Sequence, residues 1–393
     1  MKILPRSAAF AALCLLVGSF ALLRGQATPS PAAPPKFAYG GDAAELAAQF
    51  TDNLVFLSAR VNLSDPSLFL LDTTAAASSI APDRAAEIGR ANAASPVLNL
   101  TGLDFPVPSL PSLPDPDFGA RYGLEYQGTI GRDFLSSLVV QVDYARETVR
   151  AYAPVSYKYS GKGIILPMAQ SSGAPLVSLR FALEKSKERT ANFIVDTSLD
   201  ASIVFDQKFL AAHHMNGDAG KTIPAVDPFT GAAGAEIGRL RDLEFGKTSV
   251  GDVLGTYSKH AFPNAGVPIA GAIGAQLLRR FTVVFDFPHH QLIFDPNSHF
   301  GDPDEEDKSG MMIVAQGSNY KTFAVAAVQP NSPAAQAGIK TGDIIAGVDT
   351  DPAADLSLLV VRNLFCQVGH KYKVVLQRGD QTKEITLQMR RYF

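Results

Sequence analysis

Two apolar stretches of this chain end in the same way, on an aspartate followed by a threonine. Residues 68–74 read LFLLDTT and residues 193–198 read FIVDTS. Each stretch is followed well downstream by an isoleucine and a glycine, Ile130-Gly131 and Ile273-Gly274, that lead into a short apolar segment. Two copies of one pattern predict two copies of one structural unit, in which Asp72 and Asp196 act as a pair.

The repeat continues beyond these motifs. Residues 130–135 are followed by strand-like segments at 139–144 and 148–152, and residues 273–278 by strand-like segments at 282–287 and 291–294. Each copy therefore predicts a short apolar helix and then a β-hairpin. Residues 37–300 are dominated by such short segments, rich in β-branched and aromatic residues and bounded by Gly, Pro, Asp or Asn, so we expect a mainly β fold with a first half at 37–155 and a second half at 156–300.

The N-terminus has the features of a secretory signal. Lys2 and Arg6 precede an apolar run at residues 8–23, and a small-x-small cleavage pattern, Gly25-Gln26-Ala27, follows. We predict a signal peptide at 1–27, a Pro- and Ala-rich linker at 28–36, and an exported protein that is periplasmic or extracellular. The alternative is an uncleaved segment that anchors the chain in a membrane. Cleavage would leave Cys366 as the single cysteine, which we expect to be a buried, inert thiol.

Charge argues against a nucleic-acid partner, because the formal net charge is −3 at pH 7 and nucleic-acid-binding proteins are usually basic. Residues 301–310, GDPDEEDKSG, predict an acidic, solvated linker in preference to a metal site. We expect no metal and no cofactor.

The last unit, residues 311–393, predicts a compact α+β domain. Ser332 and Pro333 predict a helix start, Gly338 its end, and residues 356–365 a second helix. Strands are expected at 344–348, 372–377 and 384–389.

Paired carboxylates at the ends of two apolar strands cannot both ionise easily, so they tend to share a proton. Such a pair then offers one carboxylate as a base and one carboxylic acid as an acid at the same site. A threonine hydroxyl after each aspartate can bond the opposite loop and fix the two carboxylates.

With these motifs the chain resembles the retropepsin-like and pepsin-like aspartic proteases, and most closely exported bacterial members that carry a C-terminal PDZ domain. The resemblance covers residues 40–300 and implies a bilobal acid-protease fold of two pseudo-symmetric, retropepsin-like β-barrel halves. It implies a catalytic pair Asp72 and Asp196, with Thr73 and Thr197 bracing it and the apolar-Gly pairs Ile130-Gly131 and Ile273-Gly274 packing behind it. The family has glycine at the third motif position, where this chain has Thr74 and Ser198.

The resemblance also implies a mobile hairpin over the cleft. In the second half this corresponds to the glycine-rich residues 230–238, and in the first half to a segment near 97–105, ahead of a proline-rich loop at 106–116.

The run NSPAAQAGIKTGDII at residues 331–345 resembles a PDZ domain. Such domains bind extended chain ends by adding a strand to a sheet edge. We expect the peptide loop at Tyr320, Lys321, Thr322 and Phe323.

These observations lead to an exported aspartic endopeptidase that takes a polypeptide substrate, with a PDZ module for a C-terminal or extended peptide. Two alternatives remain open. One is a catalytically weak or inactive peptide-binding scaffold, because Thr74 and Ser198 replace glycine. The other is a cell-envelope chaperone or assembly factor with no chemistry in its cleft.

Overall fold

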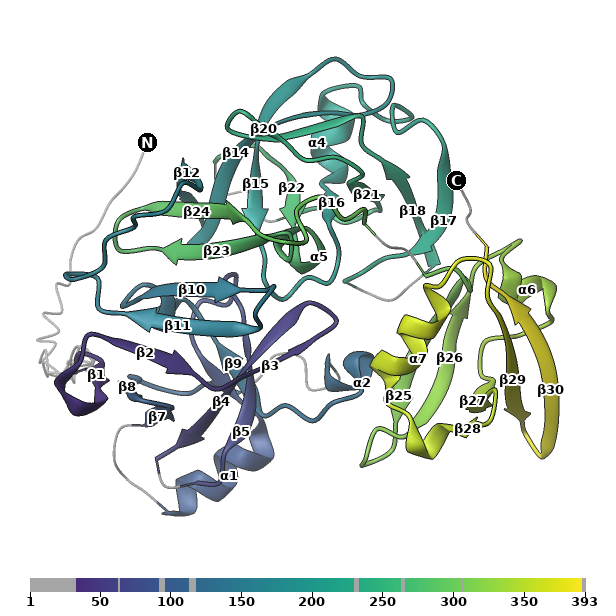
Figure 1. Cartoon of the computed structure of the whole chain (residues 1–393), viewed down its shortest axis with the longest axis horizontal. Helices are drawn as coiled ribbons and strands as arrows, with labels where there is room; N and C mark the ends of the chain where they lie inside the picture. The colour runs from purple at the N-terminus through teal and green to yellow at the C-terminus, as the bar shows by residue number, and fades with distance from the viewer. Residues whose placement is uncertain are drawn as a thin grey trace, which may run out of the picture. The chain divides into compact units, whose positions relative to one another are not determined.

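The structure is a computed structural model that describes residues 33–62, 64–91, 96–112, 118–229, 233–262, 266–304 and 307–390. The predicted signal peptide and most of the linker at 28–36 lie outside these residues. The chain is mainly β, as expected (Figure 1). In the described part of the chain, no helix is long and apolar enough to cross a lipid bilayer.

The first half is built around one main sheet. Its elements are β1 (Lys36–Phe37), η1 (Ala38–Gly40), β2 (Ala43–Leu46), β3 (Ala48–Thr51), β4 (Leu54–Val61), β5 (Ser67–Leu71), β6 (Ser79–Ile80), α1 (Pro82–Ala91), β7 (Val97–Leu100), β8 (Leu103–Pro106), α2 (Phe118–Tyr122), β9 (Gly128–Ile130), α3 (Arg132–Leu135), β10 (Val139–Asp143) and β11 (Thr148–Tyr152). The main sheet runs β1-β8-β7-β4-β5-β9-β6, with β3 paired to β4, and its central strands β4, β5 and β9 are largely buried. Its strand β5 carries the first Asp-Thr motif at its end and pairs with β9 in parallel.

The second half repeats this arrangement. Its elements are β12 (Ile164–Pro167), β13 (Ala169–Ser171), β14 (Ala174–Ala182), β15 (Arg189–Val195), β16 (Ile203–Phe205), α4 (Gln207–Ala212), β17 (Thr222–Val226), β18 (Ala233–Arg239), β19 (Asp242–Phe245), β20 (Thr248–Ser249), β21 (Leu254–Tyr257), β22 (Ile269–Ile273), α5 (Ala275–Leu278), β23 (Phe281–Asp286) and β24 (Gln291–Pro296). Strand β15 carries the second motif and pairs with β22 in parallel, as β5 pairs with β9.

The hairpins that end the two repeats meet in one sheet. Strands β10 and β23 pair antiparallel, so the order is β12-β24-β23-β10-β11-β2, and Figure 1 shows the two hairpins side by side. Their inward side chains, such as Val140, Val142 and Val283, are fully buried in a core shared by the two halves. The sheet therefore fixes the position of one half against the other.

The C-terminal unit has its own hydrophobic core. Its elements are β25 (Met311–Gln316), β26 (Thr322–Val328), α6 (Pro333–Gln336), β27 (Ile344–Val348), β28 (Asp351–Pro352), η2 (Ala353–Asp355), α7 (Leu358–Phe365), β29 (Lys371–Arg378) and β30 (Gln381–Gln388). The predicted helix start is confirmed, because the Ser332 hydroxyl accepts a hydrogen bond from Ala335 N–H and Pro333 takes the first helical position.

The predicted solvated linker at 301–310 is wrong for Asp304 and for residues 308–310, which are buried, whereas Gly301 and Pro303 are exposed. Asp304 is 2% exposed and forms an ion pair with Arg280, which is itself fully buried. Lys308 and Ser309 are also buried. A buried carboxylate is tolerated only when it is paired and hydrogen-bonded, and Arg280 supplies that pairing here.

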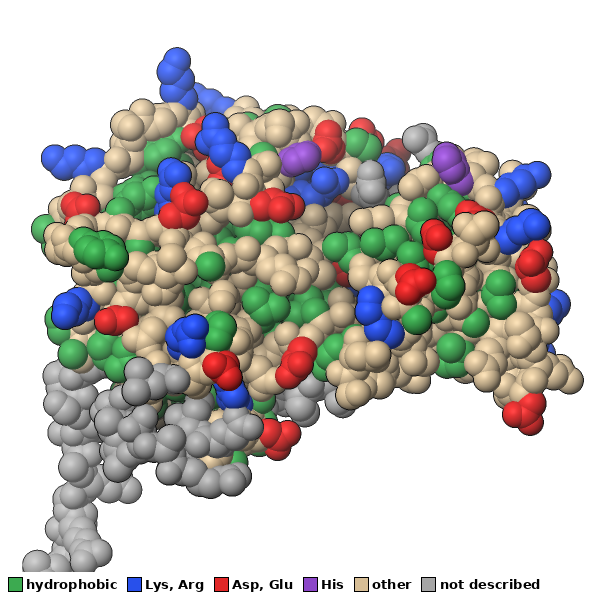
Figure 2. Space-filling view, turned by 60° about the horizontal axis from the view of Figure 1, so that its bottom comes forward, with side chains coloured by type: hydrophobic (Ala, Val, Ile, Leu, Met, Phe, Trp, Pro, Cys, Tyr) green, Lys and Arg blue, Asp and Glu red, His purple; other side chains and the backbone are tan. Residues whose placement is uncertain are grey.

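On the face shown in Figure 2, basic and acidic side chains are interspersed, and the coloured residues form no extended basic surface. This distribution agrees with the small net charge of −3.

Candidate active site

The two Asp-Thr motifs are joined by reciprocal hydrogen bonds. The Thr73 hydroxyl donates to the Val195 carbonyl at 2.6 Å, and the Thr197 hydroxyl donates to the Leu71 carbonyl at 2.6 Å. Each hydroxyl also accepts the backbone N–H of the other threonine at 3.1 Å. Both threonines are fully buried. Because each side chain is bonded to the opposite half, the aspartates that precede them are held beside one another.

Each aspartate is held by its own loop through one carboxylate oxygen. Oδ1 of Asp72 accepts the N–H of Thr74 at 2.7 Å, its hydroxyl at 2.7 Å and the N–H of Ala75 at 3.0 Å. Oδ1 of Asp196 accepts the N–H of Ser198 at 2.9 Å and its hydroxyl at 2.7 Å. The same atom in each carboxylate is thus bonded to the loop, which fixes the plane of the group.

Thr74 and Ser198 fit the positions where the family has glycine. Neither residue adopts a positive φ, so neither position requires glycine for its backbone conformation. Both hydroxyls instead donate to the neighbouring aspartate. The loops therefore tolerate these side chains and gain a hydrogen-bond donor from each.

The two carboxylates differ in their surroundings. Asp196 is 6% exposed, whereas Asp72 is half-buried. Burial first, and then repulsion from the Asp72 carboxylate, raise the pKa of Asp196 to about 7, although hydrogen bonds from Ser198 and Leu199 oppose the shift. A proton shared by the pair therefore favours Asp196 below neutral pH.

The Ile-Gly elements lie directly behind the two loops. The carbonyl of Ile130 accepts the N–H of Asp72 at 3.0 Å, and the carbonyl of Ile273 accepts the N–H of Asp196 at 2.9 Å. A Cβ at Gly131 would lie 2.7 Å from the carbonyl carbon of Ala77. These contacts leave no space for a side chain behind the Asp72 loop.

The second glycine is equally constrained. A Cβ at Gly274 would lie 2.4 Å from the carbonyl oxygen of Leu199, in the loop that follows Asp196. Gly131 and Gly274 both have extended backbones with negative φ, so close packing and not backbone conformation accounts for the two glycines.

Arg132 is a residue that the sequence analysis missed. Its Nη1 donates to the Thr74 carbonyl at 2.5 Å and its Nη2 donates to the Ser172 carbonyl at 3.2 Å. Burial lowers the pKa of the guanidinium, and the nearby Asp72 carboxylate opposes this shift. Ala275 occupies the equivalent position of the second repeat, so an alignment of the two repeats would have identified Arg132 as a charge present beside one aspartate only.

The hairpin expected over the cleft is present in part. Strands β17 and β18 pair antiparallel around the predicted residues 230–238, and the tip at 230–232 lies outside the described residues. The first-half counterpart at 97–105 is different. It forms β7 and β8, and β7 pairs with β4 as β19 pairs with β14. This segment therefore corresponds to the β19–β20 hairpin and not to β17–β18.

Among the residues that the structure describes, no group of three or more His, Cys, Asp and Glu side chains could hold a metal ion.

The C-terminal unit matches a model of the PDZ domain over residues 308–389. The unit is a PDZ domain. It supports the binding of a peptide or a partner, and its matched residues include most of the span 311–393 that we expected.

No curated protein matches the chain. Among solved structures, a photosystem II D1 C-terminal processing protease is 28% identical over 22% of this chain and 23% of that chain, with a TM-score of 0.20. The aspartic proteinase from Irpex lacteus is 12% identical over 66% of this chain and 98% of that chain, with a TM-score of 0.40.

The residues expected to form the PDZ peptide loop do not lie at a free edge of the sheet. Thr322 and Phe323 belong to β26, and Phe323 is fully buried in the core of the PDZ domain. The Lys321 ammonium group donates a hydrogen bond to the Leu356 carbonyl at 2.7 Å. Strand β26 lies between β25 and β27, so it presents no free edge for a peptide. The loop that precedes the edge strand β25 is residues 307–310.

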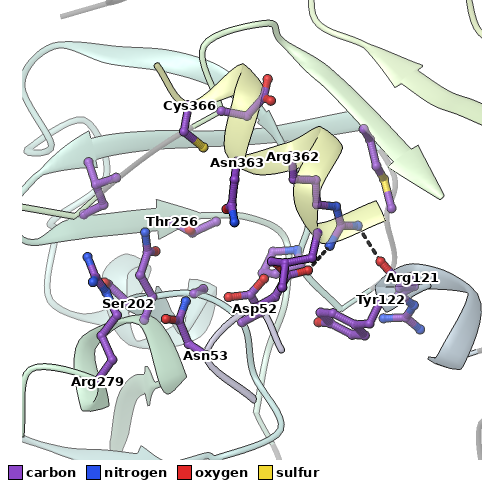
Figure 3. A pocket seen from close by; sticks show the side chains of 18 of the residues that line it. Asp52, Asn53, Arg121, Tyr122, Ser202, Thr256, Arg279, Arg362, Asn363 and Cys366 are labelled. Carbon is purple, nitrogen blue, oxygen red and sulfur yellow. Dashed lines mark hydrogen bonds and ion pairs between the residues drawn. The ribbon is translucent and has the colours of Figure 1, made fainter. Parts of the chain in front are cut away.

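A cavity of about 610 Å³ lies away from the aspartate pair (Figure 3). Its lining includes Asp52, Asp200 and Arg362 but neither Asp72 nor Asp196. Burial first, and then repulsion from Asp52, raise the pKa of Asp200 to about 7, while the Arg362 guanidinium opposes the shift. Cys366, expected to be buried, is half-exposed and also lines this cavity.

Proposed function

We propose that the chain is an exported aspartic-type endopeptidase of bilobal acid-protease fold, which cleaves polypeptides with the carboxylates of Asp72 and Asp196. The observation that carries the proposal is the reciprocal bonding of Thr73 and Thr197 across the two halves. It holds together two aspartates, one of which has a strongly raised pKa. Perturbed carboxylates of this kind are typical of catalytic acids and bases.

Different environments give the two carboxylates different roles. Asp196 holds the shared proton, because burial and the charge of Asp72 disfavour its ionised form. Asp72, which lies near the Arg132 guanidinium, acts as the general base. It removes a proton from a water molecule as the water oxygen attacks the peptide carbonyl carbon, while Asp196 donates its proton to the carbonyl oxygen.

Collapse of the tetrahedral intermediate completes the reaction. The C–N bond breaks and the amine nitrogen takes the proton that Asp72 received from water. The carbonyl re-forms and its oxygen returns a proton to Asp196, so the pair regains its starting protonation state. The products are a carboxylic acid and an amine, and no covalent intermediate is formed.

A second candidate is a peptide-binding scaffold with little or no turnover. The hydroxyls of Thr74 and Ser198 favour it, because both occupy a carboxylate oxygen that could otherwise bond to water. The hydrogen bonds described above use only Oδ1 of each aspartate. The endopeptidase mechanism would therefore use Oδ2.

Cleavage of an unfolded, fluorescently labelled casein by wild type, Asp72→Asn and Asp196→Asn tests the proposal. Loss of a general acid or base costs about 10²–10⁴ in rate, and we expect each variant to lose at least a hundredfold. Asp83→Asn is the matched control, because Asp83 is exposed on α1. Equal cleavage by all four proteins, or none by wild type, would favour the scaffold.

A further inference from the structure

We propose that the peptide groove of the PDZ domain is occupied by the chain's own residues 119–124, so that an external peptide must displace this segment before it binds. This inference does not depend on peptidase activity.

The sheet order identifies the groove. The PDZ sheet runs β25-β26-β27-β29-β30, which leaves β25 as an edge strand, and α7 packs beside it. PDZ domains bind an extended peptide by adding it as a strand to an exposed sheet edge. An antiparallel peptide on β25 would lie in the groove between β25 and α7, with its C-terminal end near residues 307–310.

A segment of the first half already fills this groove. Helix α2 lies against β25, and Gly123 follows it with a φ of +66°. A Cβ at Gly123 would lie 2.7 Å from Cβ of Leu358, the first residue of α7, and 3.5 Å from Cβ of Ala315 in β25. Gly123 is therefore in close contact with both walls of the groove.

The opposite side of the segment belongs to the first half. Tyr122 and Tyr126 pack in a buried cluster with Leu54, Phe56 and Leu70. Leu70 lies in β5, two residues before Asp72. The segment thus lies between the PDZ groove and the strand that carries the candidate catalytic aspartate.

Arg362 of α7 stabilises the contact between residues 119–124 and the PDZ domain (Figure 3). Its Nη1 pairs with Asp52, which is in the turn between β3 and β4, and its Nη2 donates to the Arg121 carbonyl of α2 and to the Ile313 carbonyl of β25. The guanidinium also lies 5.7 Å from the centre of the Tyr122 ring. One side chain therefore joins the PDZ helix, the edge strand and the occupying segment.

Backbone N–H groups of the loop at 307–310, which would receive a peptide carboxylate, are already hydrogen-bonded. Oδ1 of Asp307 accepts the N–H of Ser309 at 2.9 Å and the N–H of Gly310 at 2.6 Å. The Ser309 hydroxyl accepts the N–H of Met311 at 3.0 Å, and the N–H of Lys308 donates to the Phe365 carbonyl at 2.9 Å. These N–H groups already have partners within the domain, so a C-terminal carboxylate must compete for them.

Tethering makes even a weak contact an effective competitor. A segment joined to its site within one chain acts at an effective concentration on the order of millimolar. If its intrinsic Kd is about 0.1 mM, the apparent affinity of an external peptide falls about tenfold.

The test uses the full chain and a fluorescein-labelled peptide of residues 118–126, FGARYGLEY, as the probe. Gly123→Val inserts a side chain that cannot fit between Leu358 and Ala315, so it releases the tethered segment. Asp52→Asn removes the ion pair to Arg362 and leaves the groove and the segment unchanged. Asp83→Asn is the control. Fluorescence anisotropy reports binding, and hydrogen–deuterium exchange reports protection of the β25 amides.

We expect Gly123→Val to bind the probe at least about tenfold more tightly than wild type or Asp83→Asn, because the competitor is lost. Asp52→Asn should bind with an intermediate affinity. Exchange in β25 should rise in both variants, and a probe that carries valine in place of Gly123 should not bind. Equal probe affinity in all four proteins would overturn the proposal, and so would an absence of binding with unchanged exchange in β25.

Discussion

At the scale of single residues, Thr73 lies in the first half and Thr197 in the second, and the side chain of each is hydrogen-bonded to the opposite half. Their position after the aspartates could be read from the sequence, together with the expectation that they brace the opposite loop. The hydrogen bonds themselves depend on the position of one half relative to the other, which the shared sheet fixes. That position is a long-range property that no local sequence pattern encodes.

Thr73→Val should lower the free energy of unfolding. The change removes the hydroxyl donor to Val195 and leaves the buried N–H of Thr197 without its acceptor. Leaving a buried polar group unsatisfied costs about 1–3 kcal/mol. Urea denaturation measures the loss, with Thr190→Val as the control on an exposed strand position. An equal effect of the two changes would show that Thr73 does not brace the halves.

Thr74 and Ser198, at the third position of the two Asp-Thr motifs, differ from the residue that the family pattern has there. Thr74 and Ser198 depart from the glycine of the family, but neither has a positive φ and their hydroxyls donate to the aspartates. Arg132 was missed in the sequence analysis. Its only signal in the sequence is the contrast with Ala275 at the equivalent position of the second repeat, and its place beside Asp72 follows from the parallel pairing of β5 and β9.

At the scale of elements, the repeated strand pairs explain why each motif has a distant glycine. Strands β5 and β9 in one half, and β15 and β22 in the other, run in parallel, so the residue after β9 or β22 lies behind the Asp-Thr loop. The close approach of the chain at these points requires a residue without a side chain.

Gly131→Ala should destabilise the first half. The added Cβ would lie 2.7 Å from the backbone of Ala77, and overpacking of this kind costs about 1–3 kcal/mol. Gly301→Ala is the control, because nothing lies within 4 Å of a Cβ there. Urea denaturation of the two variants checks the difference. If Gly131→Ala were as stable as the control, the packing described for the loop would be wrong.

The elements that could be predicted were those with strong local signals. The hairpins β10–β11 and β23–β24, the short helices before them, and the capped helix at Ser332 all follow from residue patterns. The first-half hairpin at 97–105 was predicted as a strand pair but assigned to the wrong counterpart, because its partner β4 is distant in sequence. Residues 301–304 looked like a solvated linker because the buried partner of Asp304, Arg280, lies 24 residues earlier.

At the scale of the whole molecule, the segment between the second half and the PDZ domain is anchored by a buried charge pair. Arg280 pairs with Asp304 and also donates to the Gly251 carbonyl at 2.6 Å. The other oxygen of Asp304 accepts the N–H of Leu254 at 2.7 Å. The pair therefore fastens the start of this segment to the second half.

Asp304→Ala should lower the free energy of unfolding by about 3–5 kcal/mol, because it leaves the Arg280 guanidinium buried without its partner. The double variant Arg280→Met, Asp304→Leu should lose less, since it removes both charges of the pair and leaves neither one buried without its partner. Chemical denaturation measures both.

The control for this pair is Glu45→Ala, which removes an ion pair with Arg150 in which both side chains are about half exposed. It should change the free energy of unfolding by at most about 1 kcal/mol. An effect of Asp304→Ala no larger than that of Glu45→Ala would contradict the role given to the buried pair.

The pH dependence of kcat/KM for cleavage of a labelled, unfolded polypeptide tests the central claim most directly, because it reports the protonation state of the free enzyme's acid and base. We expect a bell-shaped profile whose alkaline limb falls near pH 7, where Asp196 loses its proton, and no measurable profile for Asp196→Asn. A rate that keeps rising above pH 7, or an unchanged profile in Asp196→Asn, would contradict a shared-proton aspartate pair.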